Sequence, residues 1–177
     1  MTGLTQHGLE LICDNFLRLE ALTLGNGKKP RQIISGDKLS QLRKLRFFVI
    51  YNAPGFTDKS VERGIGSPSM EKLKIINCPL SDIGLRKIAL NHGRLKNLEL
   101  RRCENITHSG LECLIRNEPL LGSMILMNFD DVGDPLLEAL EEHCPRLHRL
   151  DMINCGASDL AVEVFRERRP ALSISWS

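Results

Sequence analysis

The chain has 177 residues, of which 42% are hydrophobic and only 5% aromatic, so it is globular and not disordered. Its 24 basic and 22 acidic residues leave a net charge of +2, whereas nucleic-acid binders usually carry a stronger basic excess. No apolar run approaches the ~20 residues of a membrane span, and the N-terminus lacks the features of a secretory signal. We therefore expect neither nucleic-acid nor membrane partners, and a cytoplasmic or nuclear location.

The spacing of the cysteines indicates an internal repeat. Cys78 and Cys103 are 25 residues apart, and Cys103 and Cys155 are 52 apart, which is twice 26. The pattern Leu-x-x-Leu-x-Leu-x-x-Cys recurs with this period, which is typical of a repeat array. Its copies are Leu19, Leu22, Leu24, Gly27; Leu45, Phe48, Ile50, Ala53; Met70, Leu73, Ile75, Cys78; Leu95, Leu98, Leu100, Cys103; Leu121, Met124, Leu126, Phe129; Leu147, Leu150, Met152, Cys155; and a truncated Ala171, Ile174, Trp176. Asparagine also recurs just before the cysteine position.

The N-terminal part of the chain is the least regular. The segment Gly8–Cys13 already has the pattern of the helical half of a repeat. Between Gly25 and Gly36 the chain carries glycine, proline and three basic residues, which predicts a long exposed loop, followed by a short helix from Lys38 to Lys44. Loops of this length are often functional, although decay of a repeat near the end of an array explains the loop equally well.

Each later repeat predicts one strand and one helix. The paired leucines alternate with period two, which indicates a strand with one buried face. The residues downstream have helical spacing and follow turn residues such as Ser81, Thr107 and Ser158, which suit helix N-caps. The helical positions are Leu85, Ile88, Ala89; Leu111, Leu114, Ile115; Leu137, Leu140; and Val162, Phe165.

One strand and one helix cannot bury their apolar faces alone, but stacked copies can. The predicted fold is therefore an α/β solenoid of about seven repeats of 25–26 residues. Its parallel sheet lines the concave face and its helices cover the convex face. We expect residues 1–177 to form one such array, within a longer protein.

The cysteines are expected to be structural. Three disulfides would need an oxidising compartment, and no Cys-x-x-Cys pair suggests zinc. A small buried hydrophobic side chain is therefore the favoured role for Cys78, Cys103 and Cys155. Helix packing is the expected role of Cys113 and Cys144.

No catalytic constellation, cofactor motif or metal-binding motif occurs in the sequence. The five histidines lie in different repeats. We therefore predict a non-enzymatic protein without a cofactor or metal.

Function is expected on the concave face, at the strand positions that alternate with the buried leucines. This face collects exposed apolar and aromatic residues among charges, which favours a protein-binding surface. Coverage by an adjoining segment of the chain, or β-propensity alone, would also account for them. The predicted contacts are Phe47, Val49, Tyr51, Lys72, Lys74, Ile76, Asn97, Glu99, Arg101, Ile125, Met127, Arg149 and Asp151. Phe47, Tyr51, Lys74 and Arg101 are the expected contact centre, and Arg149 and Asp151 its charged flank.

The repeat resembles the cysteine-containing class of leucine-rich repeats. In that family the unit Cys-x-x-Ile-Thr-Asp-x-Gly-Leu is followed by Cys-Pro-x-Leu-x-x-Leu. Residues 103–111 match the first half with His108 in place of aspartate, and residues 144–150 match the second half. The resemblance implies the substrate-receptor part of an F-box protein in an SCF-type ubiquitin ligase. Because no F-box is present in these residues, binding to a Skp1-type adaptor is expected only if an F-box exists elsewhere in the full-length chain. The alternative is an F-box-free scaffold or regulatory protein.

Overall fold

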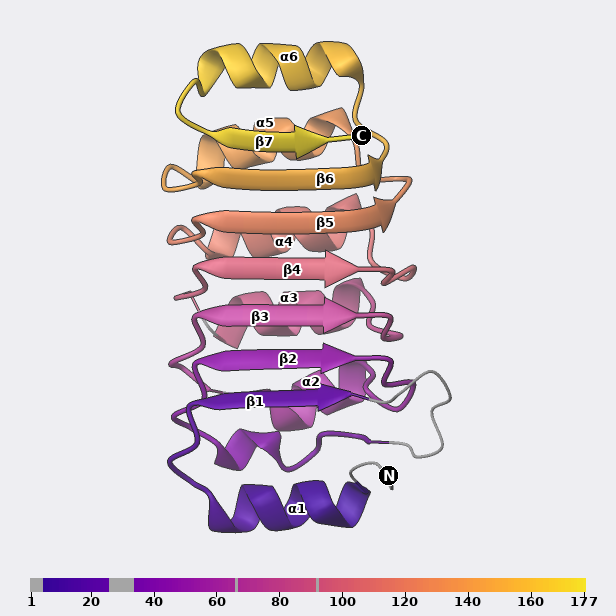
Figure 1. Ribbon diagram of the computed structural model, residues 1–177, viewed down its shortest axis with the longest axis vertical. Coiled ribbons are helices and arrows are strands. Elements are labelled where there is room, and N and C mark those ends of the chain that lie inside the picture. Colours follow the sequence, from indigo (N-terminus) through magenta and orange to yellow (C-terminus); the bar gives the residue numbers. More distant parts are fainter. Residues whose placement is uncertain (1–4, 26–33, 66, 92) are drawn as a thin grey trace.

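A computed structural model describes residues 5–25, 34–65, 67–91 and 93–177. Seven parallel strands form one sheet in which each strand lies beside its neighbours in sequence. Figure 1 shows this order from β1 to β7 along the long axis of the molecule. The strands are β1 (Ala21–Gly25), β2 (Phe47–Tyr51), β3 (Lys72–Ile76), β4 (Asn97–Arg101), β5 (Ser123–Phe129), β6 (Arg149–Cys155) and β7 (Ser173–Trp176).

The helices alternate with the strands; in the view of Figure 1, α2 to α5 lie behind the sheet, whereas α1 and α6 lie beyond its two ends. The predicted strand–helix order is therefore confirmed. The helices are α1 (Gln6–Asn15), α2 (Asp58–Gly64), α3 (Asp82–Asn91), α4 (His108–Asn117), α5 (Asp134–His143) and α6 (Asp159–Arg168), with one 3-10 turn, η1 (Leu39–Gln41), between β1 and β2.

The register of the sheet agrees with the repeat. Leu73 pairs with Phe48 on one side and Leu98 on the other, so equivalent leucine positions stack from strand to strand. All three side chains are at most 1% exposed. Because a shift of one residue would turn every side chain to the other face, this stacking fixes which residues face away from the helices.

Each of the five strands from β2 to β6 leads into or contains a residue with positive φ. Four of these residues are the recurring asparagines, Asn52, Asn77, Asn128 and Asn154, and the fifth is Arg102. Asparagine adopts this left-handed conformation more readily than most other residues. Its amide also links repeats, since Asn77 Nδ2 donates to Asn52 Oδ1 at 2.8 Å and Asn154 Nδ2 donates to Asn128 Oδ1 at 2.9 Å.

The helix N-termini are linked in a similar way. Asp82 accepts hydrogen bonds from the backbone N–H and the hydroxyl of Thr107, and Asp134 accepts the same pair from Ser158. Asp58 does so for Ser81. These carboxylates each bind the start of the next helix, so they stabilise the stacking of repeats as well as the turns.

The irregular segment differs in part from the prediction. The helix expected from Lys38 to Lys44 is wrong, because only the 3-10 turn η1 forms. Its buried residues Leu39, Leu42 and Leu45 are spaced by three, which suits a 3-10 turn better than an α-helix. Residues 26–33 of the predicted loop lie outside the described residues.

The six cysteines are free thiols. Cys13, Cys78, Cys103 and Cys144 are buried, whereas Cys113 and Cys155 are half-buried. Burial raises the pKa of Cys78 and of Cys144 to about 11, so both remain protonated at neutral pH. The burial predicted for Cys78 and Cys103 agrees with this environment, whereas Cys155, for which burial was also predicted, is half-buried because its side chain lies where β6 ends.

Candidate functional site

The candidate site is the face of the sheet opposite the helices, here called the open face. Its side chains alternate with the buried positions along each strand. Strand pairing aligns them into three rows. The first row is Phe47, Lys72, Asn97, Ser123 and Arg149; the middle row is Val49, Lys74, Glu99, Ile125 and Asp151; and the third row is Tyr51, Ile76, Arg101, Met127 and Ile153. All thirteen residues predicted from the sequence belong to these rows, so the structure places them on one surface.

Two aromatic side chains mark the β2 end of the open face. Phe47 and Tyr51 are each 37% exposed. The Tyr51 ring lies directly over Gly25 of β1, where a Cβ atom would overlap the ring. The Arg46 guanidinium carbon lies 5.3 Å from the centre of the Phe47 ring, within cation–π range. Glycine at position 25 and arginine at position 46 therefore help to place the exposed rings.

The two carboxylates of the open face are engaged by neighbouring cations. Lys74 Nζ lies 2.8 Å from Glu99 Oε1, and Arg101 Nε forms an ion pair with the same oxygen. Arg149 donates to Asp151 Oδ2 through Nε at 3.1 Å and through Nη2 at 2.7 Å. Glu99 and Asp151 are only 8% and 7% exposed. A buried carboxylate requires such partners, so part of the charge on this face is structural.

The near-burial of Glu99 and Asp151 differs from the prediction, in which both residues were exposed contacts of the open face. Sequence alternation predicts the face of a strand but not how far neighbouring long side chains fold over a shorter one. The available indication was the cross-strand register, since Glu99 lies beside Lys74 and Asp151 lies two residues from Arg149.

The third row is mainly apolar. Tyr51, Ile76, Met127 and Ile153 are exposed or half-buried, and Arg101 is the charged member between them. Adjacent strands are about 4.8 Å apart, so these side chains form a continuous stripe near the carboxyl ends of the strands.

A small cavity of about 180 Å³ lies at the opposite, amino-terminal side of the open face. It is lined by Lys72, Asn97, Ser123 and Arg149 of the first row, together with Leu73, Leu98, Glu99 and Ile125. The four first-row side chains that line the cavity end in an ammonium, an amide, a hydroxyl and a guanidinium group, all of which donate hydrogen bonds.

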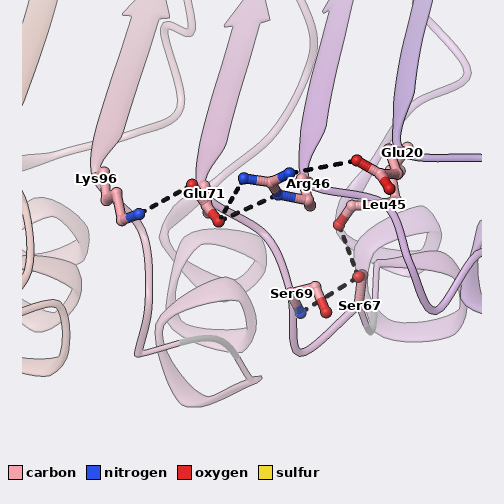
Figure 2. A network of polar contacts seen from close by, with 7 residues as sticks. All are labelled: Glu20, Leu45, Arg46, Ser67, Ser69, Glu71 and Lys96. Atoms are coloured by element: carbon pink, nitrogen blue, oxygen red, sulfur yellow. Dashed lines mark hydrogen bonds and ion pairs between the residues drawn. The ribbon is translucent and has the colours of Figure 1, made fainter.

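A ladder of alternating charges borders the open face at the strand starts (Figure 2). Arg46 bonds to Glu20 at 3.3 Å and to Glu71 at 3.1 Å, and Lys96 bonds to Glu71 at 3.0 Å. The hydrogen bond from Lys96, followed by the one from Arg46, lowers the pKa of Glu71. Because these groups are solvent-accessible, each pair contributes little to stability, but the alternation favours one register between repeats.

No group of three or more histidine, cysteine, aspartate or glutamate side chains is arranged to hold a metal ion among the described residues. None of the described helices has the length and apolarity needed to cross a membrane.

Comparison with known proteins bears on the fold. No protein-family model and no curated protein matches the chain. Among solved structures, the chain is similar to an internalin, InlF, from Listeria monocytogenes, with a TM-score of 0.59 over 91% of the chain and 18% sequence identity. The fold is a leucine-rich-repeat solenoid. The chain spans about half of that internalin, since 48% of the internalin is covered, and at this identity the likeness concerns the fold alone.

Proposed function

We propose that the chain is a non-enzymatic protein-recognition module that holds a partner protein on the open face of its sheet. The observation that carries this proposal is the stripe of Tyr51, Ile76, Met127 and Ile153, in which Tyr51 is exposed and the other three are half-buried, together with the exposed Phe47 at the other end of β2. Large apolar side chains clustered among charges are typical of the energetic centre of a protein interface. The similarity to an internalin supports the same class of role, because it assigns a fold that presents one extended sheet face.

The contact centre of this proposal is Phe47, Tyr51, Lys74 and Arg101. The two rings offer apolar area at the β2 end, while Lys74 and Arg101 present cations beside them. Arg149 and Asp151 form the charged flank two strands further along. The remaining predicted contacts surround this centre; they are Val49, Lys72, Ile76, Asn97, Glu99, Ile125 and Met127.

The finer proposal is that the module is the substrate receptor of an SCF-type ubiquitin ligase, which rests on the resemblance of its repeats to those of F-box proteins. The alternative is a scaffold or regulator without a ligase role. Binding of purified Skp1 by the full-length natural protein separates the two. Stoichiometric binding supports the receptor, and no binding favours the scaffold.

Site-specific photo-crosslinking tests the binding face. We would replace Met127 on the open face by p-benzoylphenylalanine and, as a matched control, Leu160, which is 71% exposed on α6. In an extract of the source organism, we expect one or a few discrete adducts from position 127 and none from position 160. The adduct is identified by mass spectrometry, and the purified partner should bind the Tyr51→Ala variant more weakly. Equal crosslinking at both positions, or a partner indifferent to Tyr51, would overturn the proposal.

A further inference from the structure

The charges on the open face do not balance. The open face carries four cations and two carboxylates, which leaves a formal excess of two positive charges. The cations are Lys72, Lys74, Arg101 and Arg149, and the carboxylates are Glu99 and Asp151. Both carboxylates are nearly buried and already contact cations. Lys72, by contrast, is exposed and forms no ion pair within the described residues. An incoming partner therefore meets a cationic surface.

The donors of the first row are arranged in a line. Lys72, Asn97, Ser123 and Arg149 come from the four consecutive strands β3 to β6 and line the same cavity. At about 4.8 Å per strand this line is ~14 Å long, which is the length of four or five extended residues.

The apolar third row runs parallel to this line. First and third rows are four residues apart along each strand, or ~13 Å. Successive side chains of an extended peptide point to opposite sides. A peptide lying across the strands can therefore turn alternate residues toward the donors and the others toward the apolar stripe.

We propose that the partner presents an extended segment in which acidic residues alternate with apolar ones. The carboxylates lie along the first row, and the apolar side chains lie against Tyr51, Ile76, Met127 and Ile153. This inference rests on the proposed function, since it specifies the ligand of the same face. Complementary charge should mainly accelerate association and fix the direction of the segment.

Displayed peptide libraries test this chemistry. Three twelve-residue libraries, biased to acidic, neutral and basic residues, are selected against the purified full chain at ~50 mM salt. We expect enrichment from the acidic library alone, with acidic and apolar residues alternating. The selected peptides should bind Lys72→Glu about tenfold more weakly. They should bind the control Lys87→Glu, the same charge change on exposed α3, as well as the unaltered chain.

The outcomes separate this inference from the proposed function. Neutral or basic binders that are lost in Tyr51→Ala but insensitive to Lys72→Glu overturn the acidic segment and keep the binding face. Binders insensitive to both variants overturn both proposals. Failure to enrich any peptide, or preferential binding of a single-stranded oligonucleotide probe through Lys72, also overturns the acidic segment.

A second inference comes from a different observation, the hydrogen bonds between repeats. Side-chain bonds link β3–α3 to β4–α4, for example from Thr107 to Asp82 and from Arg86 to Ser109. They also link β5–α5 to β6–α6, for example from Ser158 to Asp134 and from Arg168 to Glu141. Among the described residues, no side-chain hydrogen bond or ion pair joins β4–α4 to β5–α5, and the side-chain attraction that crosses this junction is the longer-range one between Glu112 of α4 and His143 of α5.

The cause lies in substitutions at the repeat positions that elsewhere form these bonds. Gly122 ends the charge ladder after Lys96, and Arg102 interrupts the asparagines. His108 stands where other repeats have the accepting aspartate, and Gly133 stands where they have the serine or threonine that donates to it. Phe129 stands where Cys103 and Cys155 bond to a carbonyl of the preceding strand. Cys144 stands at the position of Glu118, which accepts backbone N–H bonds.

We infer that the solenoid opens at this junction into two cooperative units, one ending with α4 and the other beginning with β5. The backbone bonds between β4 and β5 and the apolar packing of α4 on α5 remain. In a repeat protein, stability is a sum of the units and their neighbouring interfaces. Among the junctions between complete strand–helix units of the described chain, the one without side-chain hydrogen bonds is therefore expected to open first.

Native-state hydrogen exchange of the full chain in increasing urea tests this inference. We expect the protected amides of β2–β4 and those of β5–β6 to form two groups with different urea dependence. The variant Arg102→Asn should bring the groups closer together, whereas Arg146→Asn, at an exposed site with no positive φ, should leave them apart. A single group spanning both units in the unaltered chain would overturn the inference.

Discussion

Replacing Arg102 by asparagine should stabilise the protein. Arg102 has φ of 50° at the position where four other strands carry asparagine. Left-handed backbone costs a typical L-residue roughly 1–2 kcal/mol, and asparagine avoids part of this cost. The new amide would also lie between Asn77 and Asn128, and each exposed amide bond it forms is worth about 0.5 kcal/mol. We therefore expect the free energy of unfolding to rise by about 1–2 kcal/mol in total.

Urea denaturation followed by circular dichroism measures this change. The midpoint should move to higher urea, and the slope should stay constant or rise if the two units become more tightly coupled. Arg146→Asn serves as the matched control, because it removes the same charge from an exposed site without positive φ. An equal effect of both substitutions would show that charge alone is responsible. No stabilisation by Arg102→Asn would refute the conformational reasoning.

Three further predictions concern single residues. Cys103, 0% exposed, should tolerate serine poorly, with a loss of ~1–3 kcal/mol in urea denaturation, and its thiol should react slowly with a maleimide because burial raises its pKa. Burial also raises the pKa of Glu118, so the folded state holds this proton more tightly than the unfolded state. The free energy of unfolding should therefore rise as the pH falls from neutral toward the ordinary glutamate pKa. Urea denaturation at several pH values should show that Glu118→Gln lacks this part of the pH dependence. Gly25→Ala should displace the Tyr51 ring and weaken partner binding about as much as Tyr51→Ala, measured by calorimetry.

Much of the fold could be predicted because the repeat carries its own register. The period-two leucines located the strands, and residues such as Thr107 and Ser158 located helix starts, where each hydroxyl accepts a backbone N–H bond. The prediction failed at Lys38–Lys44, where helical composition was overridden by buried leucines spaced by three. Local propensity is a weak guide when tertiary packing determines which side chains are buried.

The sequence predicted which residues lie on the open face, but not how exposed each of them is or which ion pairs they form. Alternation placed Glu99 on the correct face, but its near-burial depends on Lys74 of β3 and Arg101 of β4, which both form ion pairs with its carboxylate. Such cover depends on side-chain conformation, which a single sequence does not specify. The ladder between Glu20, Arg46 and neighbouring repeats was also missed, although its alternating signs at one repeat position could have indicated it.

Binding and stability measured on the same variants test the open face most directly. Tyr51→Ala is a cleaner probe than Arg101→Ala, because Arg101 also holds the nearly buried Glu99. With the purified crosslinked partner, Tyr51→Ala should weaken binding by about 1 kcal/mol or more while leaving the melting temperature nearly unchanged. The control Ile83→Ala, at a side chain 63% exposed on α3, should change neither quantity. Binding unchanged in Tyr51→Ala but reduced in Ile83→Ala would contradict the account and move the partner to the helical face.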